Sequence, residues 1–209
     1  MSARSSLLSL ALVGCGHRGP PAPEADPAKV SALAAQLLDH MPVPVAVREC
    51  KPAELAAPVT LTFRTLRELG GQTVGKEPEQ AEWVNPASLD TPAAHALLDA
   101  PDATAKRQAA ATLLAAPAWI VYRVDLVNAP MALGIKELKT GTIGTRIIRY
   151  DRASTQPACV TVFNFQNSPD KTEWAISVSN KAFIDPAVAK VLRDDLAAQY
   201  VKLLPRGPR

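Results

Sequence analysis

The sequence has few of the residues and patterns on which most catalytic and nucleic-acid-binding sites are built. Its 209 residues include only 5% aromatics and three histidines, His17, His40 and His95, which do not pair at metal-ligand spacing. It contains no GxSxG nucleophile elbow, no P-loop and no GxGxxG fingerprint. Long runs of lysine or arginine are absent and the net charge is +3. We therefore expect no metal, no cofactor and no nucleic-acid partner.

A hydrophobic run long enough to span a membrane is also absent from the start of the chain. The apolar segment from Leu7 to Val13 is far shorter than the ~20 residues that a transmembrane helix needs. It follows one positive residue, Arg4, and runs into Leu12-Val13-Gly14-Cys15. A charged start, a short apolar run and small residues are the general pattern of a cleaved export signal. The opening of the chain resembles the lipobox signal peptide of bacterial lipoproteins.

The resemblance implies a specific modification at Cys15. Leu12 stands at −3, Val13 at −2, Gly14 at −1 and the cysteine at +1 of the lipobox. Cleavage would free Cys15, whose sulfur receives a diacylglyceryl group and whose new amine is also acylated. Two or three acyl chains anchor a protein stably, whereas a single chain binds reversibly. A plain secretory signal, or a buried N-terminal helix, is the alternative interpretation.

The residue after the lipobox cysteine bears on the destination. In the family an aspartate there often retains the protein in the inner membrane, whereas this chain has Gly16. That favours the outer membrane of a Gram-negative cell, with the protein facing the periplasm or the cell surface. Residues 16–26 are rich in proline and show no apolar periodicity, which is typical of an extended tether. We expect a signal peptide over 1–14, a lipidated tether over 15–26 and a single domain over 27–204.

Two cysteines remain after Cys15 is assigned to lipid. Cys50 and Cys159 form an even pair in a compartment that the signal makes oxidising, so we expect a disulfide between them. The bond would close a loop of about 110 residues, which the chain-entropy model values at ~4–5 kcal/mol. Two buried free thiols are the main alternative. A catalytic thiol is less favoured, because neither cysteine lies in a CxxC pattern.

Helical patterns dominate the first half of the chain. Asp26-Pro27 starts a helix with an apolar stripe over Val30, Leu33, Leu37 and Met41. A helical turn is expected at 51–55, a short helix from Pro92 to Ala100, and a longer one capped by Asp102 and ending near Ala116. The stretch from Thr60 to Leu69 reads as a further helix, although Val59, Leu61 and Phe63 alternate as in a strand.

The second half is rich in β-branched and aromatic residues. It predicts strands over 119–127, 145–150, 159–165 and 172–179, joined by short polar turns. A short strand is also possible over 43–47. A final helix starts at Asp185-Pro186, with a stripe over Val188, Val191, Leu192, Leu196 and Tyr200. The fold class expected is α+β: a helical N-terminal half packed on a four- or five-stranded antiparallel meander, with a C-terminal helix across the sheet.

One cluster of polar residues stands out in the strands. In the strand over 145–150, residues 146, 148 and 150 share one face, and residues 147 and 149 share the other. The simplest interpretation is cross-strand ion pairs on a solvated face, each worth ~0.2–1 kcal/mol. The functional interpretation is a basic groove for an anionic partner such as a glycan or a phospholipid headgroup. The residues of the cluster are Arg123, Asp125, Arg146, Arg149, Tyr150 and Asp151.

The sequence thus indicates a cellular location more clearly than an activity. We recognise no domain family in residues 27–204. The pattern favours a membrane-anchored envelope lipoprotein that binds or assembles with an envelope protein or a glycan and is not an enzyme. The alternative is a periplasm-facing hydrolase that acts on an envelope polymer or on lipid. A non-lipidated secreted domain is the third possibility.

Overall fold

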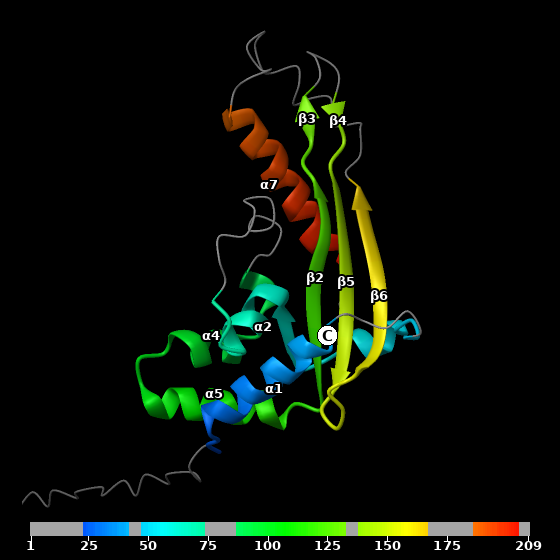
Figure 1. The fold of residues 1–209 in the computed structure, drawn as a ribbon. Coiled ribbons are helices and arrows are strands. Elements are labelled where there is room, and N and C mark those ends of the chain that lie inside the picture. The colour runs from blue at the N-terminus through cyan, green and yellow to red at the C-terminus, as the bar shows by residue number, and fades with distance from the viewer. Residues whose placement is uncertain (1–22, 42–46, 74–86, 133–137, 167–185, 205–209) are drawn as a thin grey trace, which may run out of the picture.

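A computed structural model describes residues 23–41, 47–73, 87–132, 138–166 and 186–204. Its centre is a four-stranded sheet with the spatial order β1-β2-β5-β6. The strand β1 pairs with β2 in parallel, whereas β2, β5 and β6 pair antiparallel in sequence. A separate two-stranded sheet extends the β2–β5 end (Figure 1). The strands are β1 (Val59–Thr62), β2 (Ala118–Asn128), β3 (Met131–Ala132), β4 (Leu138–Lys139), β5 (Thr142–Asp151) and β6 (Pro157–Gln166).

The α+β class agrees with the prediction, but the antiparallel meander is wrong as a description of the whole sheet. Only β2, β5 and β6 form a meander, and β1 joins them in parallel. The connectivity is compatible with parallel pairing, because the chain passes through helices between β1 and β2 and a parallel pair needs such a crossover. The strand predicted over 172–179 lies in a part of the chain that the structure does not describe. Most of the predicted 43–47 strand does too.

Four of the described helices pack on one face of the sheet and bury the larger part of the core. Figure 1 shows them gathered at one end of the long strands. Two of them begin as predicted, each with an aspartate as its N-cap. The Asp26 carboxylate accepts a hydrogen bond from the Ala28 N–H at 2.9 Å, and the Asp102 carboxylate accepts one from the Ala105 N–H at 2.8 Å. The predicted turn at 51–55 is the 3-10 helix η1 (Pro52–Leu55). The helices are α1 (Pro27–Asp39), α2 (Phe63–Leu69), α4 (Pro92–Asp99) and α5 (Ala103–Ala115).

The helical N-terminal half is interrupted by a strand, which corrects the single helix expected over 60–69. Val59–Thr62 forms β1, and Thr62 then caps α2 by accepting a hydrogen bond from the Thr65 N–H at 3.2 Å. Val59 and Leu61 point into the core beneath the helices, in register with Trp119 and Val121. Both periodic patterns in this stretch are therefore real, one after the other.

The helix α7 (Pro186–Leu203) packs against the opposite face of the sheet. Its buried side chains include Leu196 and Tyr200, and the Tyr200 hydroxyl lies 2.6 Å from the Thr145 hydroxyl. Leu192 is buried as expected, while the side chains of Val188 and Val191 lie outside the described part of the helix. The sheet therefore has an apolar layer on both faces, but the two layers cover different lengths of it.

Candidate functional site

The face of the sheet beneath α1, α2 and α5 is covered over one end only. Figure 1 shows the helices gathered at one end of the long strands, with β2, β5 and β6 running on beyond them. Val121, Ile148 and Val160 form a row across these strands and pack against the helical core. The next row, Arg123, Arg146 and Val162, lies past the helices and is half-buried or exposed.

We call this exposed region the open face and define it by five residues. Two of them are apolar and well exposed, since Leu126 is 51% and Val162 62% exposed. The side chains of Arg123 and Arg146 are each 30% exposed. Arginine is one of the residue types enriched in protein–protein interfaces. The open face consists of Arg123, Asp125, Leu126, Arg146 and Val162.

A β-bulge shapes the open face. Val124 pairs with Thr145 and Leu126 pairs with Gly144, so Asp125 is an extra residue in β2. The insertion shifts the alternation by one residue, which lets both Val124 and Val127 pack on the α7 side. Leu126 is thereby turned onto the open face beside Asp125.

Asp125 holds the two arginines of the open face. Its carboxylate accepts hydrogen bonds from Arg146 Nε at 2.5 Å and Nη2 at 2.7 Å, a bidentate pair. Arg123 Nε lies 3.2 Å from the same carboxylate. The hydrogen bond to Asp125 raises the pKa of Arg146 above its usual value. Two guanidinium groups thus share one carboxylate.

An aromatic ring supports one of these arginines. The guanidinium carbon of Arg123 lies 5.0 Å from the centroid of the Phe63 ring, within cation–π range. Phe63 is the first residue of α2, so the helical layer contacts the open face through this ring. Stacking and ion pairing together restrict the rotamers of Arg123, so its remaining donors are held in place.

The predicted polar cluster does not form one surface. Arg123, Asp125 and Arg146 come together, but Arg149 lies on the opposite face of β5 with Asp151 nearby. Tyr150 is buried in the helical core, where its hydroxyl lies 3.6 Å from the Met41 sulfur. Burial raises the pKa of Tyr150 to about 12. The alternation predicted for the strand is right, but the helices cover the Tyr150 end of its face.

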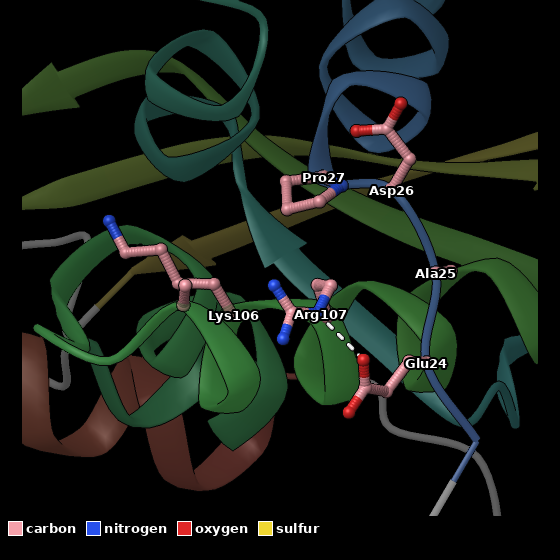
Figure 2. Close-up of a pocket in the computed structure, with 7 residues that line it drawn as sticks. Glu24, Ala25, Asp26, Pro27, Lys106 and Arg107 are labelled. Carbon is pink, nitrogen blue, oxygen red and sulfur yellow. Dashed lines mark hydrogen bonds and ion pairs between the residues drawn. The ribbon is translucent and has the colours of Figure 1, made fainter.

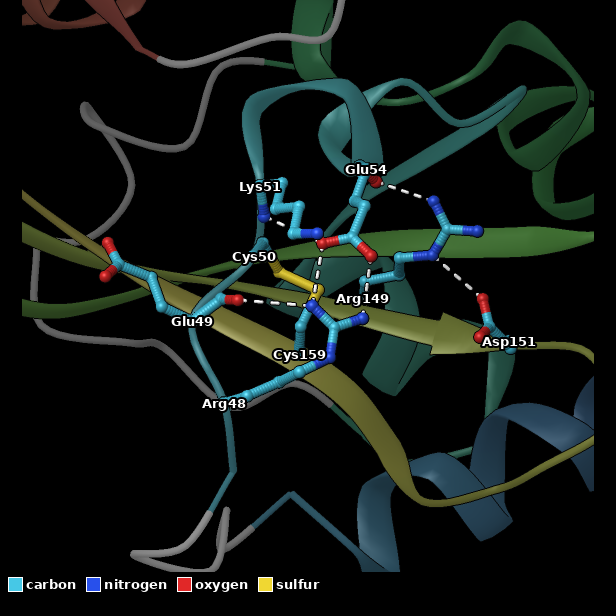
Figure 3. Close-up of a disulfide and its surroundings, with 8 residues drawn as sticks. All are labelled: Arg48, Glu49, Cys50, Lys51, Glu54, Arg149, Asp151 and Cys159. Atoms are coloured by element: carbon cyan, nitrogen blue, oxygen red, sulfur yellow. Dashed lines mark hydrogen bonds and ion pairs between the residues drawn. A yellow bond between two sulfur atoms is a disulfide. The ribbon is translucent and has the colours of Figure 1, made fainter.

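Arg149 belongs instead to the surroundings of a disulfide (Figure 3). Cys50 and Cys159 are bonded, with their Cα atoms 4.9 Å apart, and both are buried. Arg149 donates from Nη1 to the Glu54 carbonyl at 2.7 Å and from Nε to Asp151 at 2.8 Å. The contacts fix η1 against the sheet next to the disulfide.

Glu54 is the most connected carboxylate in this region. Arg48 donates to both of its oxygens at 2.7 Å, and the Lys51 N–H donates to one of them at 2.7 Å (Figure 3). The hydrogen bond from Arg48, followed by that from Lys51, lowers the pKa of Glu54 to about 2. These bonds close the turn that carries Cys50, so we assign them a structural role.

A second polar cluster, around Asp90, is buried between β1 and α2. The Asp90 carboxylate accepts hydrogen bonds from the Thr62 N–H at 2.5 Å and from the Thr65 hydroxyl at 2.7 Å. His95 Nε2 lies 3.9 Å from it. Burial raises the pKa of Asp90, while the hydrogen bonds from Thr62 and Thr65 lower it. The cluster links β1, α2 and α4. No local pattern marks Asp90 as part of a cluster, because it stands in an irregular polar stretch.

An open cleft of about 490 Å³ lies where the predicted tether meets the domain (Figure 2). Arg107 of α5 donates from Nε to Glu24 at 2.6 Å, and its carbonyl accepts from the Ala25 N–H at 3.0 Å. Asp26 on the same rim caps α1. The last residues of the predicted tether therefore pack on α5, and most charged groups of the cleft already serve the fold.

The two histidines that the structure describes belong to different helical segments. His40 Nδ1 contacts the Gln36 carbonyl at the end of α1, whereas His95 lies on α4 beside Asp90. His17 and the proposed lipidation site, Cys15, fall within 1–22, which the structure does not describe. Among the residues that it does describe, no group of three or more histidine, cysteine or acidic side chains is placed to hold a metal ion. None of the described helices has the length and hydrophobicity needed to cross a bilayer.

Comparisons with known proteins do not assign the chain. No protein-family model matches it, and neither a curated protein nor a solved structure does. The open face, the disulfide and the sequence signal at Cys15 are therefore the features from which a function can be argued.

Proposed function

We propose that the protein is a lipid-anchored lipoprotein of the bacterial cell envelope, acting as a non-enzymatic binding or assembly component. The observation that carries the proposal is the sequence Leu12-Val13-Gly14-Cys15 behind a short apolar run. The proline-rich stretch that follows suits a spacer between a bilayer and a domain. Gly16, in place of aspartate, favours the outer membrane as the destination.

The disulfide supports an extracytoplasmic location. Cys50 and Cys159 are joined across a sequence separation of 109 residues, and both sulfurs are buried among apolar side chains. Structural disulfides persist in the periplasm and outside the cell and are rare in the cytosol. An exported lipoprotein would pass through such a compartment.

Binding is favoured over hydrolysis by where the polar groups lie. The pair that most resembles part of a catalytic site is His95 with Asp90. The hydroxyls that contact Asp90 belong to Thr62 and Thr65, which are buried, so neither could reach a polymer or lipid outside the protein. The open face, by contrast, presents charged and apolar side chains to solvent.

Metabolic labelling with a clickable palmitate analogue tests the anchor. The wild-type protein should carry the label and sediment with membranes, and Cys15→Ala should lose the label. A variant in which Cys50 and Cys159 are both replaced by alanine is the matched control and should keep it. Absence of label from the wild type, or its retention in Cys15→Ala, would overturn the lipoprotein proposal.

A further inference from the structure

We infer that the open face docks an acidic segment of a partner protein, in which a carboxylate side chain stands beside an apolar one. The inference rests on the proposed binding role and names the chemistry of the partner. The occupant follows from three properties of the open face: its unbalanced charge, its exposed apolar residues and its distance from the tether.

Charge is the first property. Arg123 and Arg146 share the single carboxylate of Asp125, so the three side chains carry a net charge of +1. Within the described ranges, no hydrogen bond involves Arg123 Nη1 or Nη2, or Arg146 Nη1. A second carboxylate would balance the charge and accept from these donors. Guanidinium groups recognise carboxylates through such charge-assisted pairs.

Apolar exposure is the second property. Val162 stands directly opposite Arg146 on β6, and Leu126 follows Asp125 on β2. Val162 is thus next to Arg146 across the sheet, Leu126 lies further along β2, and both remain more than half exposed. A partner that covers them must present apolar groups next to its acid. An acidic peptide segment with neighbouring aliphatic side chains satisfies both demands.

Preorganisation adds to both properties. Phe63 stacks on Arg123 and Asp125 fixes Arg146 through two bonds, so both guanidinium groups are already oriented before any partner arrives. Side chains ordered in advance lose less conformational entropy on binding.

Position in the fold argues against a lipid headgroup as the occupant. The described chain begins at Pro23 beside α5, at the helical end of the molecule, whereas Leu126 lies toward the β3–β4 end of β2 (Figure 1). An anchor at Cys15 would hold the helical end nearer the bilayer. A glycan is disfavoured because sugar rings stack on open aromatic faces, and the Phe63 ring lies against Arg123.

Site-specific photocrosslinking of the full chain in its own cells tests the inference. Benzoylphenylalanine replaces Val162, and in a control strain it replaces Leu203, an apolar residue of α7 that is 58% exposed. We expect a discrete protein adduct at position 162 that is absent at 203. Its cross-linked peptide, identified by mass spectrometry, should contain aspartate or glutamate next to an apolar residue.

The arginines must be required for that adduct. In an Arg123→Gln/Arg146→Gln background the adduct should weaken by about tenfold or more, as expected when a charge-assisted hydrogen bond is lost. An adduct that is unchanged in this background, an adduct to lipid or glycan, or no adduct above the level at 203 would overturn the inference.

A second variant guards against misfolding of the double arginine variant. With the crosslinker at Leu126, Val162→Asp should abolish the adduct, because the new carboxylate competes for Arg146 and repels an acidic partner. Val162→Asn, of similar size and neutral, is the matched control and should retain it; equal adducts in the two variants would contradict the docking of an acid. Palmitate labelling of the same strains reports separately on the anchor, so failure of one proposal is distinguishable from failure of the other.

Discussion

Arg123 and Arg146 face each other directly across β2 and β5, and Asp125, the extra residue of a bulge, lies between their guanidinium groups. Like charges at directly opposed positions of an antiparallel pair destabilise it. Asp125 compensates by pairing with both. The bulge thus places a carboxylate between the two arginines, and it leaves both arginines positioned to bind a second carboxylate.

This arrangement predicts the effect of removing the carboxylate. Asp125→Asn should lower the free energy of unfolding by about 0.5–1 kcal/mol, because two opposed guanidinium groups lose their shared partner. The further substitution Arg146→Gln should lower the free energy of unfolding less in the Asp125→Asn background than in the wild type. The reason is that it removes the repulsion between the two arginines. Urea unfolding of the four proteins of this double-mutant cycle measures the coupling. Strictly additive effects would show that Asp125 does not bridge the arginines.

The disulfide should contribute more to the stability of the fold than any single ion pair on the surface. It closes a loop with a sequence separation of 109 residues. For a loop of this size the chain-entropy model gives about 4–5 kcal/mol. Replacing Cys50 and Cys159 together with alanine should therefore lower the melting temperature markedly, and reductant should do the same to the wild type only. Unfolding curves with and without reductant measure this, and identical curves for the wild type would argue against the bond.

Glu54 should make the stability of the fold depend on pH. Its pKa falls from 4.5 to about 2 in the fold, chiefly through the hydrogen bond from Arg48. A carboxyl with a depressed pKa stabilises the fold above its unfolded pKa, and this contribution is lost as the pH falls through the folded value. The stability difference between wild type and Glu54→Gln should therefore shrink between about pH 4.5 and pH 2. A difference that stays constant over this window would contradict the assigned contacts.

The buried Asp90 cluster predicts a contrast between two substitutions. Asp90→Ala leaves the Thr62 N–H and the Thr65 hydroxyl without their acceptor and should cost about 1–3 kcal/mol. Asp90→Asn keeps an oxygen for Thr62, and its amide can donate to the Thr65 hydroxyl once that group turns. We expect the asparagine variant to be clearly the more stable of the two in denaturant titrations. Equal losses would mean that negative charge, rather than hydrogen bonding, holds β1 to α2.

The sequence predicts those elements whose signals are local. Asp26 and Asp102 stand at helix starts with their caps, and both helices form where expected. The stretch from Val59 to Leu69 carries strand and helix periodicities in succession, and the boundary at Thr62 depends on its capping bond. Neither pattern alone could place that boundary.

Features that depend on pairing between distant segments could not be predicted. The parallel direction of β1 depends on its pairing with the distant strand β2, across a helical crossover, and no local pattern encodes it. Alternation correctly separates Tyr150 from Arg149, yet only the tertiary packing of α1 shows that Tyr150 is buried. The bulge at Asp125 is likewise visible only in the register of β2 against β5.

The candidate site was therefore only partly predictable. Arg123, Asp125 and Arg146 are found together because their strands are neighbours, which the antiparallel turns predicted. Phe63 and Val162 were missed because they come from other elements and carry no charge to mark them. Val162 is exposed, and Phe63 stacks on Arg123, because the helical layer ends next to these residues.

The most direct test of the proposed anchor is the mass of the N-terminal tryptic peptide of the mature protein. We expect a peptide that begins at Cys15, ends at Arg18 and carries a diacylglyceryl group and an acylated amine. A mature chain that keeps residues 1–14, or one that begins with an unmodified Cys15, would contradict it.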